Sequence, residues 1–382
     1  MSGSNKQERF CRLIALPFFL IFLLYVIYSG ATARSQSLAQ GRISTTPTTT
    51  STSTTTSSTT ETEEATTTAA AQATVPTAPA AVPDHLPSFL SKLWRSAATD
   101  HDFSDDEKRW TRTWTDLNPY LRTELLTDQS GEAFIRSRYG RTRPDIVAVF
   151  TGLRIPILRA DLLRYLVLLA EGGIWSDLDA ECTLEIAKWN ITEPKQVGAK
   201  GELTQGGGGG DDSSIDMIVG LEFDMDWRGV GQIASQFTNW VIAARPSSHH
   251  LQFVVDSVIG RLRQIAEDNK VDISGITLDM LSNVVDVTGP KMMTVSILKS
   301  LSVMMGHTVD DRHFHGIKSP QLIGDLLVLQ GNAFASAQNG YPHDQGDQYI
   351  AHHYNGAWKK EADAARERRK KLEEAKKAGN GT

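Results

Sequence analysis

The chain has 382 residues, a formal net charge of −6 and only two cysteines. Its Lys and Arg residues form no basic stripe, which argues against nucleic acid as the main partner, because neutralising phosphates needs clustered positive charge. Composition changes along the chain and predicts five regions. These are a cytosolic tail (1–12), a signal-anchor transmembrane helix (13–33), a disordered Ser/Thr-rich stem (34–83), a folded domain (84–360) and a charged helical tail (361–382).

The predicted anchor is an unbroken apolar and aromatic run over residues 13–28, which mild residues extend to 33. With that extension it reaches the roughly 20 residues that a membrane helix needs. Three basic residues precede the run and only Arg34 follows it closely, so the positive-inside rule puts the N-terminus in the cytosol and the rest in the lumen. A cleaved signal peptide, ending at residues 31–33, is the alternative.

Cysteine positions fit this topology. Cys11 and Cys182 would lie on opposite sides of the membrane, so no internal disulfide is expected. Cys182 is predicted to be a small buried apolar residue rather than a nucleophile. The stem between anchor and domain has almost no large apolar side chains, so it cannot bury enough surface to fold, and its hydroxyls invite O-glycosylation.

Apolar spacing and end signals predict the elements of the folded domain. The segment 89–94 fits a helical turn as well as a strand. Further along, the expected helices are 110–117, 132–139, 144–150, 156–170, 231–244, 251–266 and 290–301, and the expected strands are 125–126, 174–176, 215–221 and 326–329. Alternation of strands with helices predicts an α/β domain with a mainly parallel central sheet. The glycine-rich stretch 195–214 is read as a surface insertion, since no Gly-Lys-Ser/Thr follows it.

The strongest chemical signal is the pair of carboxylates at Asp177 and Asp179. A helix, the stop Gly172-Gly173 and a short strand lead directly into them. Residues i and i+2 of an extended segment project to the same side, so both carboxylates can reach one ligand. Two hard oxygen donors suit Mg²⁺ or Mn²⁺ carrying a diphosphate. Phosphatases with an aspartyl nucleophile also use D-x-D, but the flanking residues and the absence of a matching lysine motif favour a metal-bridging role.

Asp161 and Arg164 lie three residues apart on the preceding helix and share a face. A surface ion pair would contribute little to stability. This helix is apolar almost all round, however, so the pair is predicted to be buried and to need partners. Sugar hydroxyls or a diphosphate would meet that need.

Together these residues carry a family resemblance. The segment I-P-I-L-R-A-D-L-L-R-Y-L-V-L-L-A-E-G-G-I-W-S-D-L-D resembles the sugar-binding D-x-D region of glycosyltransferase family 32, in its fungal initiation-specific α-1,6-mannosyltransferase branch. Further matches are Gln236-Phe237-x-x-Trp240, Thr288-Gly289-Pro290, and His352-His353 followed by Gly356-x-Trp358. The resemblance covers about residues 86–360.

This resemblance implies a GT-A type nucleotide-sugar-binding domain, a GDP-mannose donor, Mn²⁺ or else Mg²⁺, and transfer with retention of anomeric configuration. The acceptor would be a mannose-containing glycan, with α-1,6 linkage on N-glycans as the first expectation. The protein would be a single-pass type II Golgi membrane protein, with its catalytic domain in the lumen, and a complex with other glycosyltransferases is compatible with the resemblance.

Carried over residue by residue, the resemblance assigns roles within the site. Asp177 would meet the nucleotide sugar and Asp179 the metal, while Asp161 and Arg164 would hold the donor sugar. The other donor-site assignments are Trp175 and Trp94 against the base or donor wall, His353 as third metal ligand or diphosphate contact, and Trp358 as a diphosphate hydrogen-bond donor. Ala357 replaces the Ser that the family usually has. Weaker candidates near the acceptor are Glu222, Asp224 and Asp226.

Two other functions stay open at this point. Within the same family, the acceptor could be inositol-phosphoceramide, although such enzymes tend to carry further membrane segments and no second apolar run of spanning length occurs here. From another class, the chain could be a membrane-tethered protein that binds sugar through a metal without transferring it. The sequence leaves the acceptor, the linkage and the oligomeric state undetermined.

Overall fold

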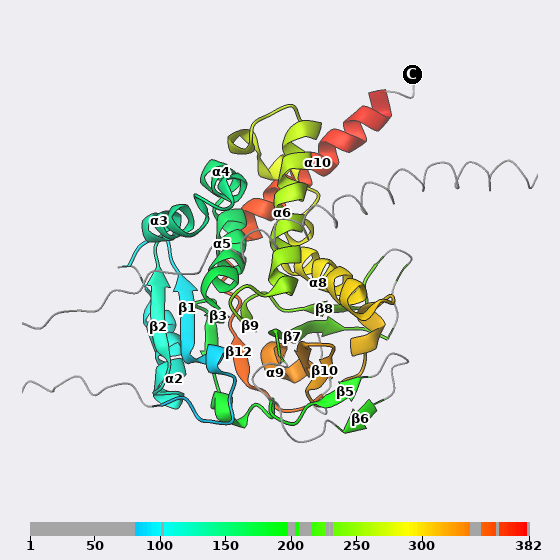
Figure 1. Cartoon of the computed structure of the whole chain (residues 1–382). Coiled ribbons are helices and arrows are strands. Elements are labelled where there is room, and N and C mark those ends of the chain that lie inside the picture. Colours follow the sequence, from blue (N-terminus) through cyan, green and yellow to red (C-terminus); the bar gives the residue numbers. More distant parts are fainter. Residues whose placement is uncertain are drawn as a thin grey trace, which may run out of the picture. The chain divides into compact units, whose positions relative to one another are not determined.

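The computed structural model describes residues 81–100, 103–197, 203–205, 215–226, 229, 232–336, 345–356 and 359–379 (Figure 1). The predicted anchor at 13–33, nearly all of the predicted stem and Trp358 lie outside the described residues. Within the part of the chain that is described, no helix combines the length and the apolar character needed to cross a bilayer.

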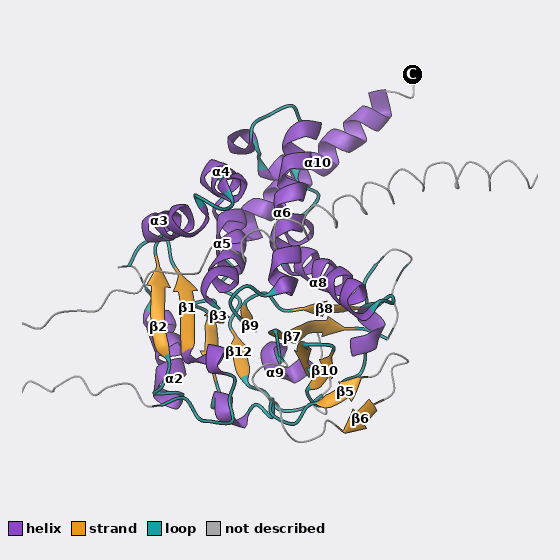
Figure 2. Cartoon of the chain, in the orientation of Figure 1, coloured by secondary structure: helices purple, strands orange, loops and turns teal. Residues whose placement is uncertain are grey.

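A ten-stranded sheet forms the centre of the fold (Figure 2). Its strand order is β2-β1-β3-β9-β7-β11-β10-β5-β6, with β8 paired to β7 beside this path. The strands are β1 (Lys92–Ser96), β2 (Arg122–Leu126), β3 (Gly173–Ser176), β5 (Lys195–Val197), β6 (Leu203–Gln205), β7 (Met217–Asp224), β8 (Ser235–Phe237), β9 (Val241–Ala244), β10 (Gln321–Ile323) and β11 (Leu326–Leu329). A separate pair joins β4 (Ala180–Cys182) to β12 (Ile350–His352).

The sheet mixes the two strand orientations. Strands β2, β1 and β3 are mutually parallel, as are β7 and β11, while β9 runs antiparallel between β3 and β7. The predicted α/β class is therefore confirmed. Because β9 is antiparallel to both β3 and β7, these two strands run in the same direction.

Helices cover both faces of this sheet. The α-helices are α2 (Asp105–Leu117), α3 (Asp128–Tyr139), α4 (Pro144–Gly152), α5 (Pro156–Glu171), α6 (His249–Asp268), α7 (Val284–Val287), α8 (Pro290–Met305), α9 (Gly331–Ala335) and α10 (Lys359–Gly379). Alternate residues of the strands contribute to two apolar clusters, because successive side chains point to opposite faces. One cluster lies under α3 to α6 and α8, and the other under α2 and α9.

Local sequence explains why α5 begins and ends where it does. Pro156 occupies its first turn, where a missing N–H costs nothing. Gly172 follows it with φ +66°, a conformation that favours glycine, and a Cβ there would lie 2.5 Å from the Pro246 ring. The chain then turns straight into β3 at Gly173.

One predicted helix is wrong. Residues 231–244 were expected to be helical, but the segment contains β8 and β9, joined by a short turn. Strand β9 is buried on both faces between β3 and β7, and an apolar run buried on both faces looks the same in a helix or a strand. The undecided segment 89–94 resolves into a 3₁₀ turn, Ser88–Ser91, followed by β1.

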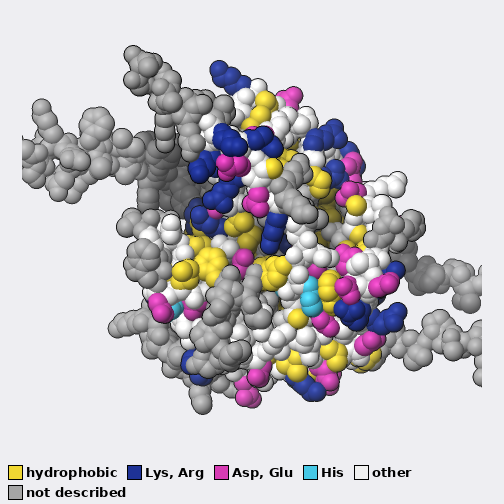
Figure 3. Space-filling view, turned by 180° about the vertical axis from the view of Figure 1, so that it is seen from behind, with side chains coloured by type: hydrophobic (Ala, Val, Ile, Leu, Met, Phe, Trp, Pro, Cys, Tyr) yellow, Lys and Arg dark blue, Asp and Glu magenta, His cyan; other side chains and the backbone are white. Residues whose placement is uncertain are grey.

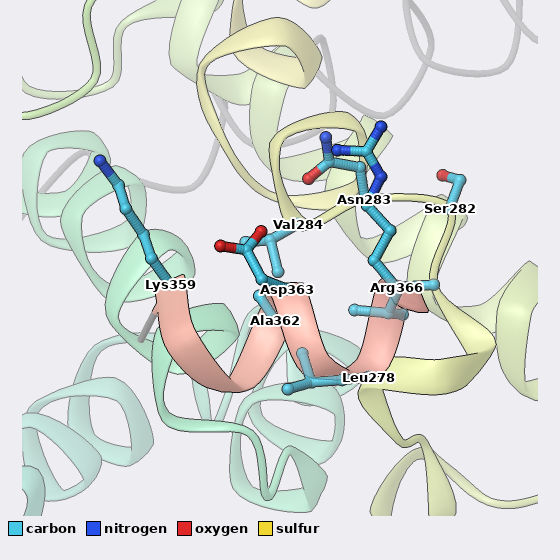
Figure 4. A pocket seen from close by; sticks show the side chains of 9 residues that line it. Leu278, Ser282, Asn283, Val284, Lys359, Ala362, Asp363 and Arg366 are labelled. Atoms are coloured by element: carbon cyan, nitrogen blue, oxygen red, sulfur yellow. The ribbon is translucent and has the colours of Figure 1, made fainter. Parts of the chain in front are cut away.

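The charged C-terminal helix α10 is docked along part of its length. Its first turns line a small cavity of about 200 Å³ together with the loop before α7 (Figure 4). Arg368 donates to both carboxylate oxygens of Asp279, at 3.1 and 3.3 Å. Lys and Arg side chains gather in the upper part of the face seen in Figure 3, at the height that α3, α4 and α10 occupy in Figure 1.

Candidate active site

The two carboxylates predicted from the sequence stand at the carboxyl end of β3. The Asp177 amide donates to the Trp240 carbonyl at 2.9 Å, and the Ala180 amide returns to the Asp177 carbonyl at 3.2 Å. The chain therefore makes a tight turn across Asp177, Leu178 and Asp179 between β3 and β4. This turn holds both carboxylates at one edge of the sheet.

Arg164 joins the two acidic residues on either side of it. Its Nη2 lies 3.0 Å from Asp161 Oδ1, and its Nη1 lies 3.3 Å from Asp177 Oδ2. Asp161 and Arg164 are almost fully buried, as predicted. Because a buried charge is costly unless it is paired, each member of this array depends on the others.

Asp161 is fixed by further hydrogen bonds from distant segments. Thr288 Oγ1 donates to Asp161 Oδ2 at 2.8 Å, and Asn239 Nδ2 donates to Asp161 Oδ1 at 3.2 Å. The Arg164 guanidinium also donates to the Asn239 carbonyl. Burial raises the pKa of Asp161, and the neighbouring Arg164 charge opposes that rise. Neither Asn239 nor Thr288 is assigned a role from the sequence. Their only signal there is their position within Gln236-Phe237-x-x-Trp240 and Thr288-Gly289-Pro290.

The carboxylates of Asp177 and Asp179 have different surroundings. Trp175 Nε1 donates to Asp177 Oδ1 at 2.7 Å, so both Asp177 oxygens have protein donors. Burial raises the pKa of Asp177 despite Arg164. Burial also tends to raise the pKa of Asp179. Hydrogen bonds from His352 and the Asn355 amide outweigh this effect and hold the Asp179 pKa below its usual range. Asp179 is therefore the more readily ionised of the two.

The histidine beside Asp179 is His352, rather than the His353 predicted from the motif. His352 Nε2 lies 3.3 Å from Asp179 Oδ1. His353 Nε2 instead lies 2.9 Å from Glu181 Oε2, and its ring stacks on Trp110 at 4.0 Å between centroids. The antiparallel register of β12 with β4 decides this, since adjacent residues of a strand point to opposite faces.

The tryptophans assigned to the donor site occupy structural positions. Trp175 is buried, and its indole orients Asp177 while Arg164 lies over its ring. Trp94 is also buried and donates to the Gly172 carbonyl at 2.9 Å, which ties β1 to the end of α5. Neither residue lines the cavity described below. The prediction for Trp358 falls outside the described residues.

A cavity of about 500 Å³ opens in front of these groups. Asp161, Arg164, Asp177 and Asp179 all line it, as do Glu222, Asn239, His352, Tyr354, Asn355 and Lys359. Burial raises the pKa of Glu222 to about 7, against the opposing effect of its hydrogen bond with Gln236. Asp224 and Asp226 are not among the lining residues, and Asp224 is held by Ser235, His315 and the Gly316 amide.

The cavity wall fits a divalent cation by its donor chemistry. Asp179 and His352 offer an oxygen and a nitrogen, and the second ring nitrogen of His352 is buried without a hydrogen-bond partner. Tyr354 Oη is likewise buried without a partner. Carboxylate and imidazole ligands suit Mn²⁺, and unpartnered polar atoms in a cavity wall are expected where a polar ligand binds.

The end of β3, the D-x-D turn and the ion-paired group Asp161–Arg164–Asp177 thus meet at one cavity. Residues 104–196 match the family described as the glycosyltransferase sugar-binding region containing a DXD motif. The resemblance inferred from the sequence is thus confirmed.

Relatives of known description agree with this class. The initiation-specific alpha-1,6-mannosyltransferase of Schizosaccharomyces pombe is 27% identical over 70% of this chain and 63% of its own length. The Candida albicans protein of the same description is 22% identical, over 72% of each chain. The mannosyl phosphorylinositol ceramide synthase SUR1 of Saccharomyces cerevisiae is 30% identical over 25% of this chain and 24% of its own. The chain thus spans less than two thirds of the S. pombe protein.

Among solved structures, the catalytic domain of alpha-toxin from Clostridium novyi is similar at a TM-score of 0.34 and 10% identity, covering 67% of this chain and 78% of that one. A similarity this distant supports no inference about the site.

Proposed function

We propose that the chain is a GT-A type, metal-dependent mannosyltransferase that moves mannose from GDP-mannose to a mannosyl acceptor with retention of configuration. The observation that carries the proposal is one cavity wall. On it, ionised Asp179 with His352 stands beside the ion-paired array of Asp161, Arg164 and Asp177, whose first two members are buried. Similarity to alpha-1,6-mannosyltransferases supports mannose as the transferred sugar and α-1,6 as the linkage.

The proposed transfer breaks the bond between mannose C1 and the diphosphate oxygen and forms a bond from C1 to an acceptor hydroxyl. GDP leaves, and the hydroxyl proton passes to the departing phosphate oxygen. A bound Mn²⁺ would neutralise the charge that develops on that diphosphate. Asp179 and His352 would hold the ion, with Asp177 adjoining.

The buried array would orient the donor sugar. Asp177 has protein donors on both oxygens, so its carboxylate is fixed in position before a ligand arrives. Pre-organised charge of this kind contributes to catalysis because it needs little rearrangement during the reaction. Glu222 on the same cavity is suited to contact the acceptor, since its raised pKa allows it either to donate or to accept a hydrogen bond near neutral pH.

The direct test is to incubate the purified full-length protein, in detergent, with GDP-mannose, Mn²⁺ and a panel of mannosyl acceptors, and to determine the linkage of the product. We expect α-1,6-mannosyl products and release of GDP. Asp179→Ala is expected to lower transfer at least about a thousandfold, or some 4 kcal/mol in barrier height, while the protein still folds. Folding is checked by circular dichroism.

Two results would contradict the proposal. Near-normal transfer by Asp179→Ala would remove the assigned metal role. Saturable binding of GDP-mannose without release of GDP, with or without acceptor, would instead identify a sugar-binding protein without transferase activity. Inositol-phosphoceramide belongs in the acceptor panel because of the 30% identical match to a mannosyl phosphorylinositol ceramide synthase.

We also propose a single-pass type II topology, with this domain in the Golgi lumen. The apolar run at 13–33 and the basic residues before it support the proposal.

A further inference from the structure

A second cluster of ligand-type side chains lies at the opposite edge of the sheet. Asp216 directly precedes β7, Asp325 directly precedes β11, and His249 and His250 begin α6. Met217, the first residue of β7, pairs with Leu326 of β11 and with Ala244 of β9. Ala244 also pairs with Gly173, the first residue of β3. The cluster therefore lies where β3 begins, whereas Asp177 and Asp179 follow the end of β3.

The spacing within this cluster is close to that of a coordination site. One ligand atom from each of the four residues lies within 4.8 Å of all the others. His250 Nε2 is 3.0 Å from Asp325 Oδ1, and His249 Nε2 is 3.6 Å from Asp325 Oδ2. Ligand atoms of a tetrahedral Zn²⁺ site lie about 3.3 Å apart, given bond lengths of about 2.0–2.1 Å. The separations in the cluster, 3.0 Å between His250 Nε2 and Asp325 Oδ1 and at most 4.8 Å across the four residues, bracket that spacing.

An unsatisfied atom indicates that the cluster is incomplete as a hydrogen-bond network. His249 Nε2 is buried and has no hydrogen-bond partner, although its ring lies between two carboxylates. Buried ring nitrogens are normally bonded, so an orphaned one aimed at carboxylates calls for an explanation. A cation at the centre would use this nitrogen and neutralise the two negative charges.

Supporting contacts fix the other ligands. His250 is fully buried, and its Nδ1 lies 2.9 Å from Ser300 Oγ, so its Nε2 is directed at Asp325. Ser248 Oγ donates to Asp216, and the Asp216 amide donates to the Asp325 carbonyl at 2.8 Å. Ligand histidines in metal sites are characteristically oriented in this way by a partner on the second ring nitrogen.

We propose that Asp216, His249, His250 and Asp325 bind a divalent transition metal of the Zn²⁺ type, separate from the D-x-D site. Two imidazole nitrogens and two carboxylate oxygens favour Zn²⁺ over Ca²⁺ or Mg²⁺, which prefer all-oxygen sites. Because the protein supplies four ligands, the site is closed and structural. It joins the start of α6 to the starts of β7 and β11.

The test measures metal binding by the untagged full-length protein after chelator treatment, without any sugar donor. Zn²⁺ is added in a titration, and elemental analysis gives the number of Zn²⁺ ions bound per protein. Co²⁺ serves as a probe because tetrahedral Co²⁺ has characteristic visible absorption. We expect one equivalent with tetrahedral Co²⁺ bands in Asp179→Asn, and the same tetrahedral bands in the unmodified protein. That variant removes a ligand only from the D-x-D site.

His249→Ala is the decisive variant, because the His249 side chain is 43% exposed and its loss leaves the core intact. It should weaken Zn²⁺ binding more than about a hundredfold, and Ser300→Ala by about 10- to 100-fold as an outer-shell change. His85→Ala, an exposed histidine elsewhere, is the matched control and should bind normally.

Absence of tetrahedral Co²⁺ bands in Asp179→Asn would overturn the proposal. Equal Zn²⁺ binding by His249→Ala and His85→Ala would do the same, and the cluster would then be an ion-pair network. Neither result bears on mannosyl transfer, so the two proposals fail independently.

Discussion

Arg164 holds several groups of the candidate site in place. It is the buried cation shared by Asp161 and Asp177, and it also donates to the Asn239 carbonyl. Removing one partner of a buried charge pair leaves the other charge uncompensated, which costs far more than the intact pair contributes.

We therefore expect Arg164→Met to lower the free energy of unfolding by about 3–5 kcal/mol. Urea denaturation of the full-length protein measures this change. Arg122→Met is the matched control, since the Arg122 side chain is largely exposed, and it should change stability by less than about 0.5 kcal/mol. Equal effects of the two substitutions would show that the ion pairs of Arg164 with Asp161 and Asp177 do not contribute to stability.

The strand pair β4–β12 determines which histidine lies beside Asp179. In its register His352 is opposite Ala180, so the His352 ring faces Asp179 and the His353 ring faces Glu181 and Trp110. Sequence spacing alone could not decide this, because a shift of one residue exchanges the two faces.

Substituting the two adjacent histidines separately tests the register. His352→Ala should raise the Mn²⁺ concentration needed for half-maximal transfer by about 10-fold or more, because it removes a proposed metal ligand. Loss of a ligand costs at least as much as loss of an outer-shell partner. His353→Ala should leave that concentration within about twofold. A larger effect from His353→Ala would restore the assignment made from the motif.

Packing between β7 and α9 depends on a glycine. A Cβ at Gly220 would lie 2.7 to 2.8 Å from three atoms of the buried Phe334 side chain. Gly220→Ala is expected to destabilise the protein by about 1–3 kcal/mol through overpacking. At the exposed Gly260 of α6 an added Cβ meets nothing within 4 Å, so Gly260→Ala should be neutral or stabilising by up to about 1 kcal/mol. Thermal unfolding of both variants provides the comparison.

At the scale of the whole molecule, stability should depend on pH through the carboxyl groups of the cavity. Burial raises the pKa of Glu222 to about 7, above its ordinary value of 4.5. Between these values the folded state holds more protons than the unfolded state, so stability falls as pH rises through the window and levels off above it.

Glu222→Gln removes this contribution and should therefore gain stability relative to the unmodified protein at pH 8 by up to about 3 kcal/mol more than at pH 4. Urea denaturation at both pH values measures the difference. An equal effect of the substitution at the two pH values would mean that Glu222 titrates normally in the folded protein.

Much of the element structure follows from the sequence because its signals are local. Pro156 and Gly172 mark the ends of α5, and the apolar period identifies α6 and α8. Strand β9 was missed because its burial on both faces comes from neighbouring strands that are distant in sequence. Its neighbours β3 and β7 begin 68 and 24 residues earlier.

The sequence by itself indicated the class of protein and the residues at the centre of the candidate site. A buried Asp161–Arg164 pair and the D-x-D turn can be read from helix spacing and strand alternation, which are properties of contiguous residues. Only the tertiary structure decided that His352 accompanies Asp179 and that Asn239 and Thr288 hold Asp161. It also brought Asp216 and Asp325 together with the adjacent His249 and His250. These contacts depend on strand register and on which distant segments lie side by side. Local sequence periodicity encodes neither.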